Sequence, residues 1–246
     1  MVLLVSVLLA AQGASPAAVP KPSPAGHNPA AAAPAAQSPA AESDLKAVLA
    51  KMNANAGNFK TAEADFEFET YQKVVDEKDV QKGRIYFRRA GKNVDAAFNI
   101  TAPAAKQVVY KDGKIRIYEP RIDQVTERDV SKNKSEVESY LSLGFGARGD
   151  DLLRDYEVKM GGWETVDGVK TAKLELTPKA EKMRQTYNSI VLWIDPEKDV
   201  LLKQQFLEPS GDYRLTHYTK MKLNARLGDD EFKLKTTGST KMVKAQ

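Results

Sequence analysis

The stretch FKTAEADFEFETYQKV, residues 59–74, decides the fold. Apolar and acidic residues alternate along it with a period of two. The apolar residues on one side of the alternation are Ala62, Ala64, Phe66 and Phe68, and the acidic residues on the other side are Glu63, Asp65, Glu67 and Glu69. Because successive side chains of a strand point to opposite faces, the stretch predicts a long antiparallel strand with one buried face and one wet face.

Further segments of strand character follow at short intervals. They are residues 83–89, 93–100, 106–112, 114–120, 124–130, 156–166, 169–178, 188–196, 199–209 and 212–223. Asp112-Gly113 between two of them is a strong signal for a tight hairpin, and Asp167-Gly168 and residues 209–212 are typical of turns. Strands do not alternate regularly with helices, which disfavours a parallel, doubly wound sheet.

Helical spacing of apolar residues occurs in two places. In residues 43–52 the apolar face consists of Leu45, Val48, Leu49 and Met52. Ser43 or Asp44 is the expected N-cap of this helix, and Gly57 is its expected end. A second helical stretch is expected over about residues 132–154, with Val137, Tyr140 and Leu141 on one face.

These elements predict a mainly β (α+β) fold. About ten or eleven antiparallel strands are too many for one flat sheet, because strand twist accumulates and makes the sheet curl. The sequence therefore predicts a curled antiparallel sheet with short helices on its concave side.

The amino-terminal region has a different composition. Residues 2–11 form an apolar run too short to cross a bilayer as a helix, and small residues follow it. We interpret residues 1–14 as a signal peptide, 15–41 as a disordered linker rich in Pro and Ala, and 42–246 as the folded domain. No Lys or Arg precedes the apolar run, so a true start upstream stays open, as does burial of the run within the domain.

Composition excludes several classes of function. The chain has no cysteine, which excludes disulfides, a thiolate nucleophile, a cysteine zinc site and a lipid-modified cysteine anchor. Its 37 basic residues are interleaved with 33 acidic ones, so the net charge of +4 is spread out and nucleic-acid binding is not expected.

Catalytic motifs are also missing from the sequence. His217 has no nucleophile or carboxylate motif around it, and we interpret it as a structural histidine. The pairs Asp150-Asp151 and Asp229-Asp230 are typical of caps or solvated loops. We predict no catalytic residue, no metal site and no cofactor, and therefore a protein that is not an enzyme.

Four segments occur in an order that resembles a known family. They are SDLKAVLAKM (43–52), GRIYFRRAGK (83–92), KQVVYKDGKIRIYEPRIDQVT (106–126) and LELTPKAEKMRQTYNSIVLWID (174–195). Over about residues 43–240 the chain resembles the periplasmic lipoprotein carriers of the LolA family. The resemblance implies an incomplete antiparallel barrel capped by a lid of helices, whose cavity binds the acyl chains of lipoproteins.

The resemblance also implies roles for individual residues. Arg89 falls at the basic position after a strand that holds the lid closed, although Arg88 beside it is an alternative. The residues expected to contact acyl chains are Leu45, Leu49, Phe66, Phe68, Ile85, Phe87, Phe98, Ile115, Ile117, Leu141, Leu192, Ile194 and Phe206. A closed core uses the same residue types as a cavity, so an ordinary core position is the alternative for each.

The function implied by the resemblance is a monomeric periplasmic carrier that shuttles lipoproteins, or another lipid, from the inner to the outer membrane. Its implied partners are acylated lipoproteins or lipids, an inner-membrane release complex and an outer-membrane acceptor. An alternative is a periplasmic module that senses lipoproteins in envelope-stress signalling. A third possibility, an enzyme acting on a lipid precursor, conflicts with the missing catalytic motifs.

Overall fold

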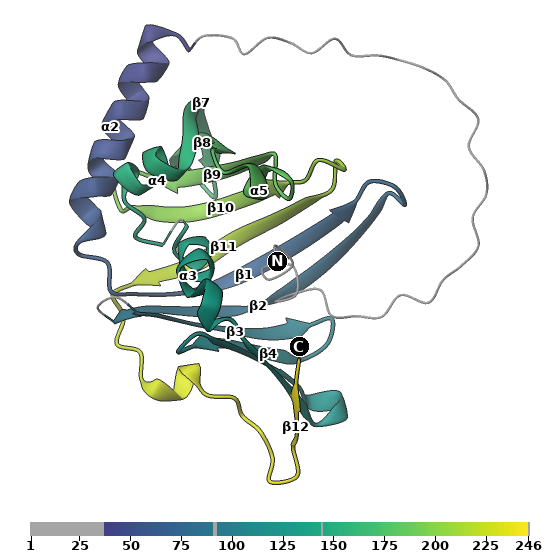
Figure 1. Cartoon of the computed structure of the whole chain (residues 1–246). Helices are drawn as coiled ribbons and strands as arrows, with labels where there is room; N and C mark the ends of the chain where they lie inside the picture. Colours follow the sequence, from purple (N-terminus) through teal and green to yellow (C-terminus); the bar gives the residue numbers. More distant parts are fainter. Residues whose placement is uncertain (1–36, 91–92, 144, 246) are drawn as a thin grey trace, which may run out of the picture.

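One curled sheet dominates the protein (Figure 1). The computed structural model describes residues 37–90, 93–143 and 145–245. The predicted signal peptide and almost all of the predicted linker lie outside these residues. The strands in chain order are β1 (Thr61–Gln72), β2 (Glu77–Ala90), β3 (Asn93–Ala102), β4 (Lys106–Lys111), β5 (Lys114–Glu119), β6 (Gln124–Asp129), β7 (Tyr156–Val166), β8 (Val169–Pro178), β9 (Ser189–Asp195), β10 (Val200–Leu207), β11 (Tyr213–Leu223) and β12 (Lys241–Lys244).

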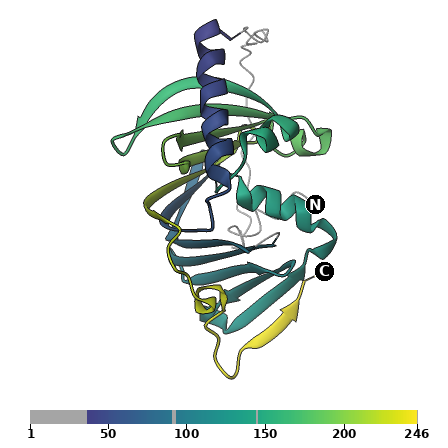
Figure 2. The ribbon, with the colours of Figure 1, turned by 90° about the vertical axis from the view of Figure 1, so that its left-hand side faces the viewer.

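The strand order explains the shape of the molecule. It runs β12-β6-β5-β4-β3-β2-β1-β11-β10-β9-β8-β7, so β12 and β7 are edges and β1 lies near the centre. Figure 2 shows the sheet bending to leave an opening in which α3 (Lys134–Ser142) lies. The predicted mainly β, curled and unclosed sheet is confirmed, with twelve strands instead of ten or eleven.

Strand β1 has the two faces that its sequence predicts. The apolar residues Ala62, Ala64, Phe66 and Phe68 are each at most 5% exposed. On the opposite face, the side chains of Asp65, Glu67 and Glu69 lie 2.8, 2.6 and 3.0 Å from cations of β2. Strand β2 begins at Glu77, six residues before the predicted start. All of the added residues except Val80 are polar, so periodicity gives no signal there, and cross-strand ion pairs join this part of β2 to β1.

The tight turns lie where the sequence predicts them. Asp112 and Gly113 both have positive φ angles, 52° and 71°, and join β4 to β5. Asp167 and Gly168 join β7 to β8 in the same way, with φ angles of 50° and 78°. Two successive residues with positive φ match the right-handed twist of the flanking strands, which is why Asp-Gly is favoured there.

Helix α2 (Pro39–Ala56) begins earlier than predicted. The Ser38 side chain accepts a hydrogen bond from the Ala41 amide at 3.3 Å, and Pro39 occupies the first helical turn. Ser38 is therefore the N-cap, and the prediction of Ser43 or Asp44 is wrong, because a cap with a following proline lies further upstream. The predicted end at Gly57 is confirmed.

The second predicted helical stretch forms two helices. These are α3 and α4 (Gly149–Asp155), separated by residues 143–148. Short helical pieces elsewhere are η1 (Pro120–Ile122), η2 (Ser131–Asn133), η3 (Asp229–Phe232) and α5 (Glu181–Arg184). The described residues between α3 and α4 lie over the concave face of the sheet, and we call residues 143 and 145–147 the lid loop.

The carboxyl-terminal segment covers the part of the outer, convex face that β3 and β4 form. Phe232 packs there against Ala97 and Val109, and the Arg88 guanidinium lies 4.4 Å from the centre of its ring. The chain then returns to the sheet edge, where β12 pairs in parallel with β6. A strand of four residues, with two apolar residues between two lysines, gives no periodic signal, which is why the sequence did not predict it.

Candidate functional site

A cavity of about 60 Å³ lies on the concave face of the sheet beneath α3. The sheet supplies one wall through β1, β2, β3, β10 and β11, and α3 with the lid loop supplies the other. The lining residues are Phe66, Phe68, Ile85, Phe87, Phe98, Tyr140, Leu141, Leu143, Phe145, Gln204, Phe206, Arg214, Thr216 and Tyr218. A mostly apolar and aromatic wall with a few polar groups is typical of a small-molecule binding site.

The structure brings together only part of the predicted set. The predicted residues that line the cavity are Phe66, Phe68, Ile85, Phe87, Phe98, Leu141 and Phe206. The remaining predicted residues, which pack in or against the main core away from the cavity, are Leu45, Leu49, Ile115, Ile117, Leu192 and Ile194. Strand β9 borders β10, and β5 is separated from β3 by β4, so the side chains of β5 and β9 fill the core on either side of the cavity.

Several lining residues were not predicted. Thr216 and Tyr218 share one face of β11, and strand alternation places His217 on the opposite face. That alternation was the available signal. However, the apolar residues Tyr213, Leu215 and Met221 share the face of His217, so the sequence favoured that face and not the one that lines the cavity. Leu143 and Phe145 lie in the lid loop, where no periodicity exists to mark a residue as buried.

Phe145 fills the opening between the lid loop and the sheet. Its ring stacks on Phe87 at 5.4 Å between centroids and meets Tyr218 edge-on at 5.3 Å. Phe145 also forms an isolated β-bridge with Val200. Gly146, next in the chain, has a φ of +65°, and a Cβ on it would lie 2.6 Å from the Phe59 ring. The sharp bend that inserts Phe145 therefore requires glycine at position 146.

Arg89 connects the sheet to the lid loop. Its guanidinium donates hydrogen bonds to the carbonyl oxygens of Gly146 at 3.2 Å and Phe145 at 3.5 Å. The alternative residue, Arg88, lies on the convex face and pairs with Asp95 at 2.7 Å and Asp229 at 2.9 Å. Of the two arginines, Arg89 is the one whose side chain contacts the lid loop.

Glu138 anchors α3 to the sheet. Its carboxylate accepts hydrogen bonds from the Tyr110 hydroxyl at 3.2 Å and from the Val94 amide at 3.4 Å. Burial, together with this carboxylate, raises the pKa of the Tyr110 hydroxyl above its ordinary value. Lys134, in the first turn of α3, donates to the Asn93 side chain at 2.8 Å. One side of α3 is thus hydrogen-bonded to β3 and β4, and its other side lines the cavity.

Polar groups are also present inside the apolar cavity. The Gln204 amide nitrogen donates to the Tyr218 hydroxyl at 2.9 Å. The Gln204 amide oxygen and the Tyr140 hydroxyl are buried and have no hydrogen-bond partner among the described residues. Burial raises the pKa values of the Tyr140 and Tyr218 hydroxyls, so both are neutral and able to donate hydrogen bonds at physiological pH.

A wider groove of about 600 Å³ separates α3 from α4. Its walls are charged: Arg89, Lys134 and Arg154 lie along it with Glu138, Asp151 and Asp155. Leu143 lines both the groove and the cavity, so the lid loop lies between the two spaces.

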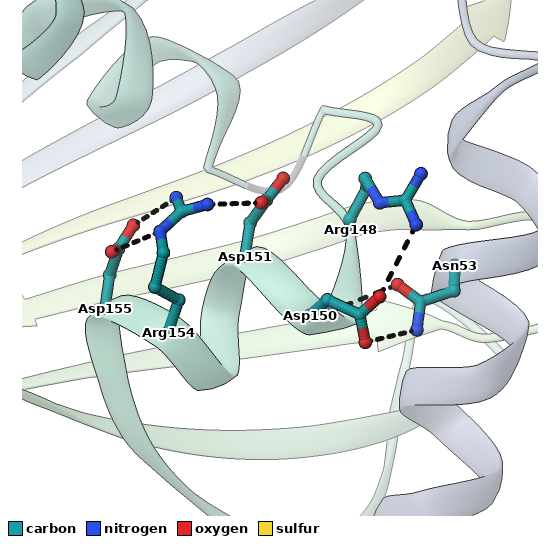
Figure 3. Close-up of polar contacts among 6 residues, drawn as sticks. All are labelled: Asn53, Arg148, Asp150, Asp151, Arg154 and Asp155. Atoms are coloured by element: carbon teal, nitrogen blue, oxygen red, sulfur yellow. Dashed lines mark hydrogen bonds and ion pairs between the residues drawn. The ribbon is translucent and has the colours of Figure 1, made fainter.

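Figure 3 shows how α4, which forms one wall of the groove, is held. The Asn53 side chain of α2 exchanges two hydrogen bonds with Asp150, donating to its carboxylate at 2.9 Å and accepting from its amide at 3.1 Å. Arg154 pairs with Asp151 at 2.7 Å and Asp155 at 2.8 Å. Asp150 and Asp151 lie inside the first turn of α4, whose N-cap is Arg148 and has no side-chain cap hydrogen bond, so the interpretation of this acidic pair as caps or loop residues is wrong.

The acidic and histidine side chains do not gather into a reactive site in the described part of the chain. His217 pairs with Asp167 at 2.7 Å on the outer face of the sheet. No group of His, Asp or Glu residues among residues 37–90, 93–143 and 145–245 has the arrangement of a metal site. No helix within these ranges is long and apolar enough to span a membrane.

Comparisons with solved structures find related folds. The complex of Pseudomonas aeruginosa MucA/MucB matches with 18% identity and a TM-score of 0.48, covering 78% of this chain and 61% of that one. MucB alone matches with 17% identity and a TM-score of 0.52, covering 82% and 66%. An uncharacterized conserved protein from Thermus thermophilus matches with 12% identity and a TM-score of 0.50, covering 82% and 99%. The chain thus spans less than two thirds of the two MucB chains.

Sequence comparison identifies the family. No curated protein sequence matches the chain. A family model described as outer membrane lipoprotein carrier protein LolA matches residues 57–235, which include every strand except β12. The match covers well over half of the chain and includes most of the curled sheet. The chain belongs to the LolA family of lipoprotein carrier proteins.

Proposed function

We propose that this protein is a periplasmic carrier that binds the acyl chains of lipoproteins, or of another lipid, in the cavity beneath α3. The observation that carries the proposal is the apolar cavity closed by the lid loop, which Arg89 holds through two backbone carbonyls. Each methylene left in water costs about 0.8 kcal/mol, so a lipid crossing an aqueous compartment needs such a shelter. Membership of the LolA family supports the same function.

The lid must move before an acyl chain can enter. The cavity holds about 60 Å³, whereas ligand sites measure roughly 300–1,000 Å³. Displacing Phe145 and α3 from the sheet would enlarge it without disturbing the strands. The lid loop is joined to the sheet by few polar contacts, which suits a carrier that must release its cargo as well as bind it.

The proposal extends to location and partners. Cargo would be loaded at an inner-membrane release complex and delivered to an outer-membrane acceptor, with residues 1–14 acting as a signal peptide and the residues between them and α2 acting as a linker to the domain. Release would begin when a partner breaks the contacts of the lid loop.

A labelled lid tests the proposal directly. The chain contains no cysteine, so a Ser142→Cys variant takes a single environment-sensitive fluorophore at the end of α3. Titration with palmitic acid or a synthetic lipopeptide is expected to change the fluorescence saturably, because the lid opens around the cargo. A matched label at Lys235, which lies on the covering segment of the convex face, is expected not to respond. Absence of a response at Ser142, together with absence of binding by a fluorescent fatty acid, would contradict the proposal.

A lipoprotein-sensing interaction module is the second candidate function. The tip of the β1–β2 hairpin carries Val74 and Val75 with 93% and 55% of their surfaces exposed, which is the kind of apolar tip that contacts a protein partner. The fold similarity to MucB is compatible with this role. Stable binding of a protein partner by a chain that does not take up lipid would favour the module over the carrier.

A further inference from the structure

Two buried polar atoms in the cavity wall point to the chemistry of the cargo. They are the amide oxygen of Gln204 and the hydroxyl of Tyr140, neither of which has a hydrogen-bond partner among the described residues. Buried polar groups in native proteins are almost always paired, because leaving one unpaired costs about 1–3 kcal/mol. Both residues line the same small cavity, one from β10 and the other from α3. A ligand lying between the sheet and the lid would contact both.

The two atoms differ in what they require of a ligand. The Gln204 amide nitrogen already donates to Tyr218, so its remaining oxygen can only accept and needs an N–H or O–H group. The Tyr140 hydroxyl can donate to a carbonyl oxygen. An amide group carries both complementary atoms, whereas an ester carries the carbonyl but has no N–H.

The cationic residue of the cavity wall is already engaged. The Arg214 guanidinium lies 2.8 Å from the Glu208 carboxylate and donates to the Tyr187 hydroxyl at 2.7 Å. Its charge is therefore balanced within the protein, and the cavity does not require the free carboxylate of a fatty acid. A neutral polar group is the better match for this wall.

We propose that Gln204 and Tyr140 form a subsite that recognises the amide linkage of an N-acylated cargo. The Gln204 oxygen accepts the amide N–H, and the Tyr140 hydroxyl donates to the acyl carbonyl when the lid closes. The subsite rests on the proposed function, since it presumes that an acyl chain occupies the cavity. It goes further by separating amide-linked from ester-linked chains. An ester would bury the Gln204 oxygen unpaired, and a site built to pair with an N–H rejects the analogue that lacks it.

The test compares two ligands that differ in one atom. N-palmitoylglycine and O-palmitoylglycolic acid have the same chain and the same carboxylate, but an N–H in the first replaces an ester oxygen in the second. The affinity of each ligand is measured by its displacement of a fluorescent fatty acid from the full-length protein. The amide is expected to bind about ten-fold more tightly, the effect of one buried hydrogen bond. Equal binding of the two ligands would overturn the subsite and leave the proposed function standing, whereas binding of neither would overturn the proposed function.

Variants assign the contacts to the two residues. Gln204→Met is expected to lower amide binding to the level of the ester. Tyr140→Phe is expected to weaken both ligands by the same factor, because both carry the carbonyl. The matched control, Gln205→Met, makes the same change one residue along β10 on the opposite face and should alter neither. A Gln204→Met protein that still prefers the amide would contradict the assignment, and thermal unfolding checks that each variant is folded.

Discussion

Arg89 is the side chain that joins the sheet to the backbone of the lid loop. Its guanidinium donates two hydrogen bonds to lid-loop carbonyls and lies 5.8 Å from the centre of the Phe59 ring. None of these side-chain contacts takes part in the pairing of the strands. Arg89→Leu is therefore expected to change the release rate of a fluorescent fatty acid several-fold while shifting the melting temperature little.

The neighbouring arginine supplies the control for this prediction. Arg88 pairs with Asp95 and Asp229 on the convex face, so Arg88→Leu should lower the melting temperature and leave the release rate unchanged. Identical release from wild type and Arg89→Leu would show that the lid loop is held by other contacts.

Phe145 closes the cavity by packing between the lid loop and the sheet. Phe145→Ala is expected to lower the free energy of unfolding by about 3 kcal/mol or more, because a buried aromatic ring is removed. It is also expected to tighten binding of a fluorescent fatty acid, because the acyl chain then fills the space of the ring. Phe232→Ala is the matched control: both rings are 3% exposed, but Phe232 lies on the convex face. If the two variants bind the fatty acid equally, Phe145 does not occupy the ligand path.

Asp199 makes the stability of the protein depend on pH. Its carboxyl is buried beside Val200, which bridges to Phe145, and burial raises its pKa from 3.8 to about 6. The folded state therefore binds this proton at a higher pH than the unfolded state does. As a result, the free energy of unfolding rises as the pH falls from about 6 to about 4. Asp199→Asn, which tolerates the φ of 52°, should be more stable than wild type at pH 7, with the difference shrinking by pH 5. A difference that stays constant across this range, measured by denaturant unfolding, would contradict the raised pKa.

At the scale of elements, one carboxylate binds the turn that precedes β12. Asp123 accepts hydrogen bonds from the hydroxyls of Thr237, Thr240 and Ser239 at 2.6, 2.6 and 2.9 Å. These bonds lower the pKa of Asp123 to about 2, so its contribution to stability is lost only as the pH falls from about 3.8 toward 2.

Asp123→Asn keeps the backbone conformation but replaces an acceptor with a donor. The amides of β12 should then exchange with deuterium about ten-fold faster, because the hydrogen bonds that hold the segment to β6 are weakened. The amides of β1 should exchange as in wild type and serve as the internal control. Unchanged exchange in β12 would mean that the parallel pairing alone holds the strand.

The elements that the sequence predicts well are those whose packing follows a local period. Strand β1 alternates strictly and lies at the centre of the sheet, and Asp112-Gly113 forms the predicted turn. Strand β12 was missed because its four residues show no period and it pairs with β6, which is distant in the sequence. The first half of β2 was missed because it is stabilised by cross-strand ion pairs instead of an apolar face.

At the scale of the whole molecule, the sequence predicts a buried face but not where that face is hollow. Phe66 and Phe87 line the cavity while Ile117 and Leu192 pack in the core, although all four are apolar strand residues at most 8% exposed. The difference arises from curling, which places β1, β2 and β11 opposite α3 and leaves β5 and β9 at the sides. The closing residues of the lid loop depend on tertiary packing, which local periodicity does not encode.

The central claim, that the cavity carries acyl chains, is tested most directly by native mass spectrometry. The full chain is expressed in the periplasm, purified without detergent and transferred intact to the gas phase. We expect masses that exceed the chain by one lipid or lipopeptide, with the excess lost in Phe68→Asp, which places a charge in the cavity wall. A spectrum of bare protein that also takes up no added fatty acid would contradict the claim and identify the apolar face as closed core.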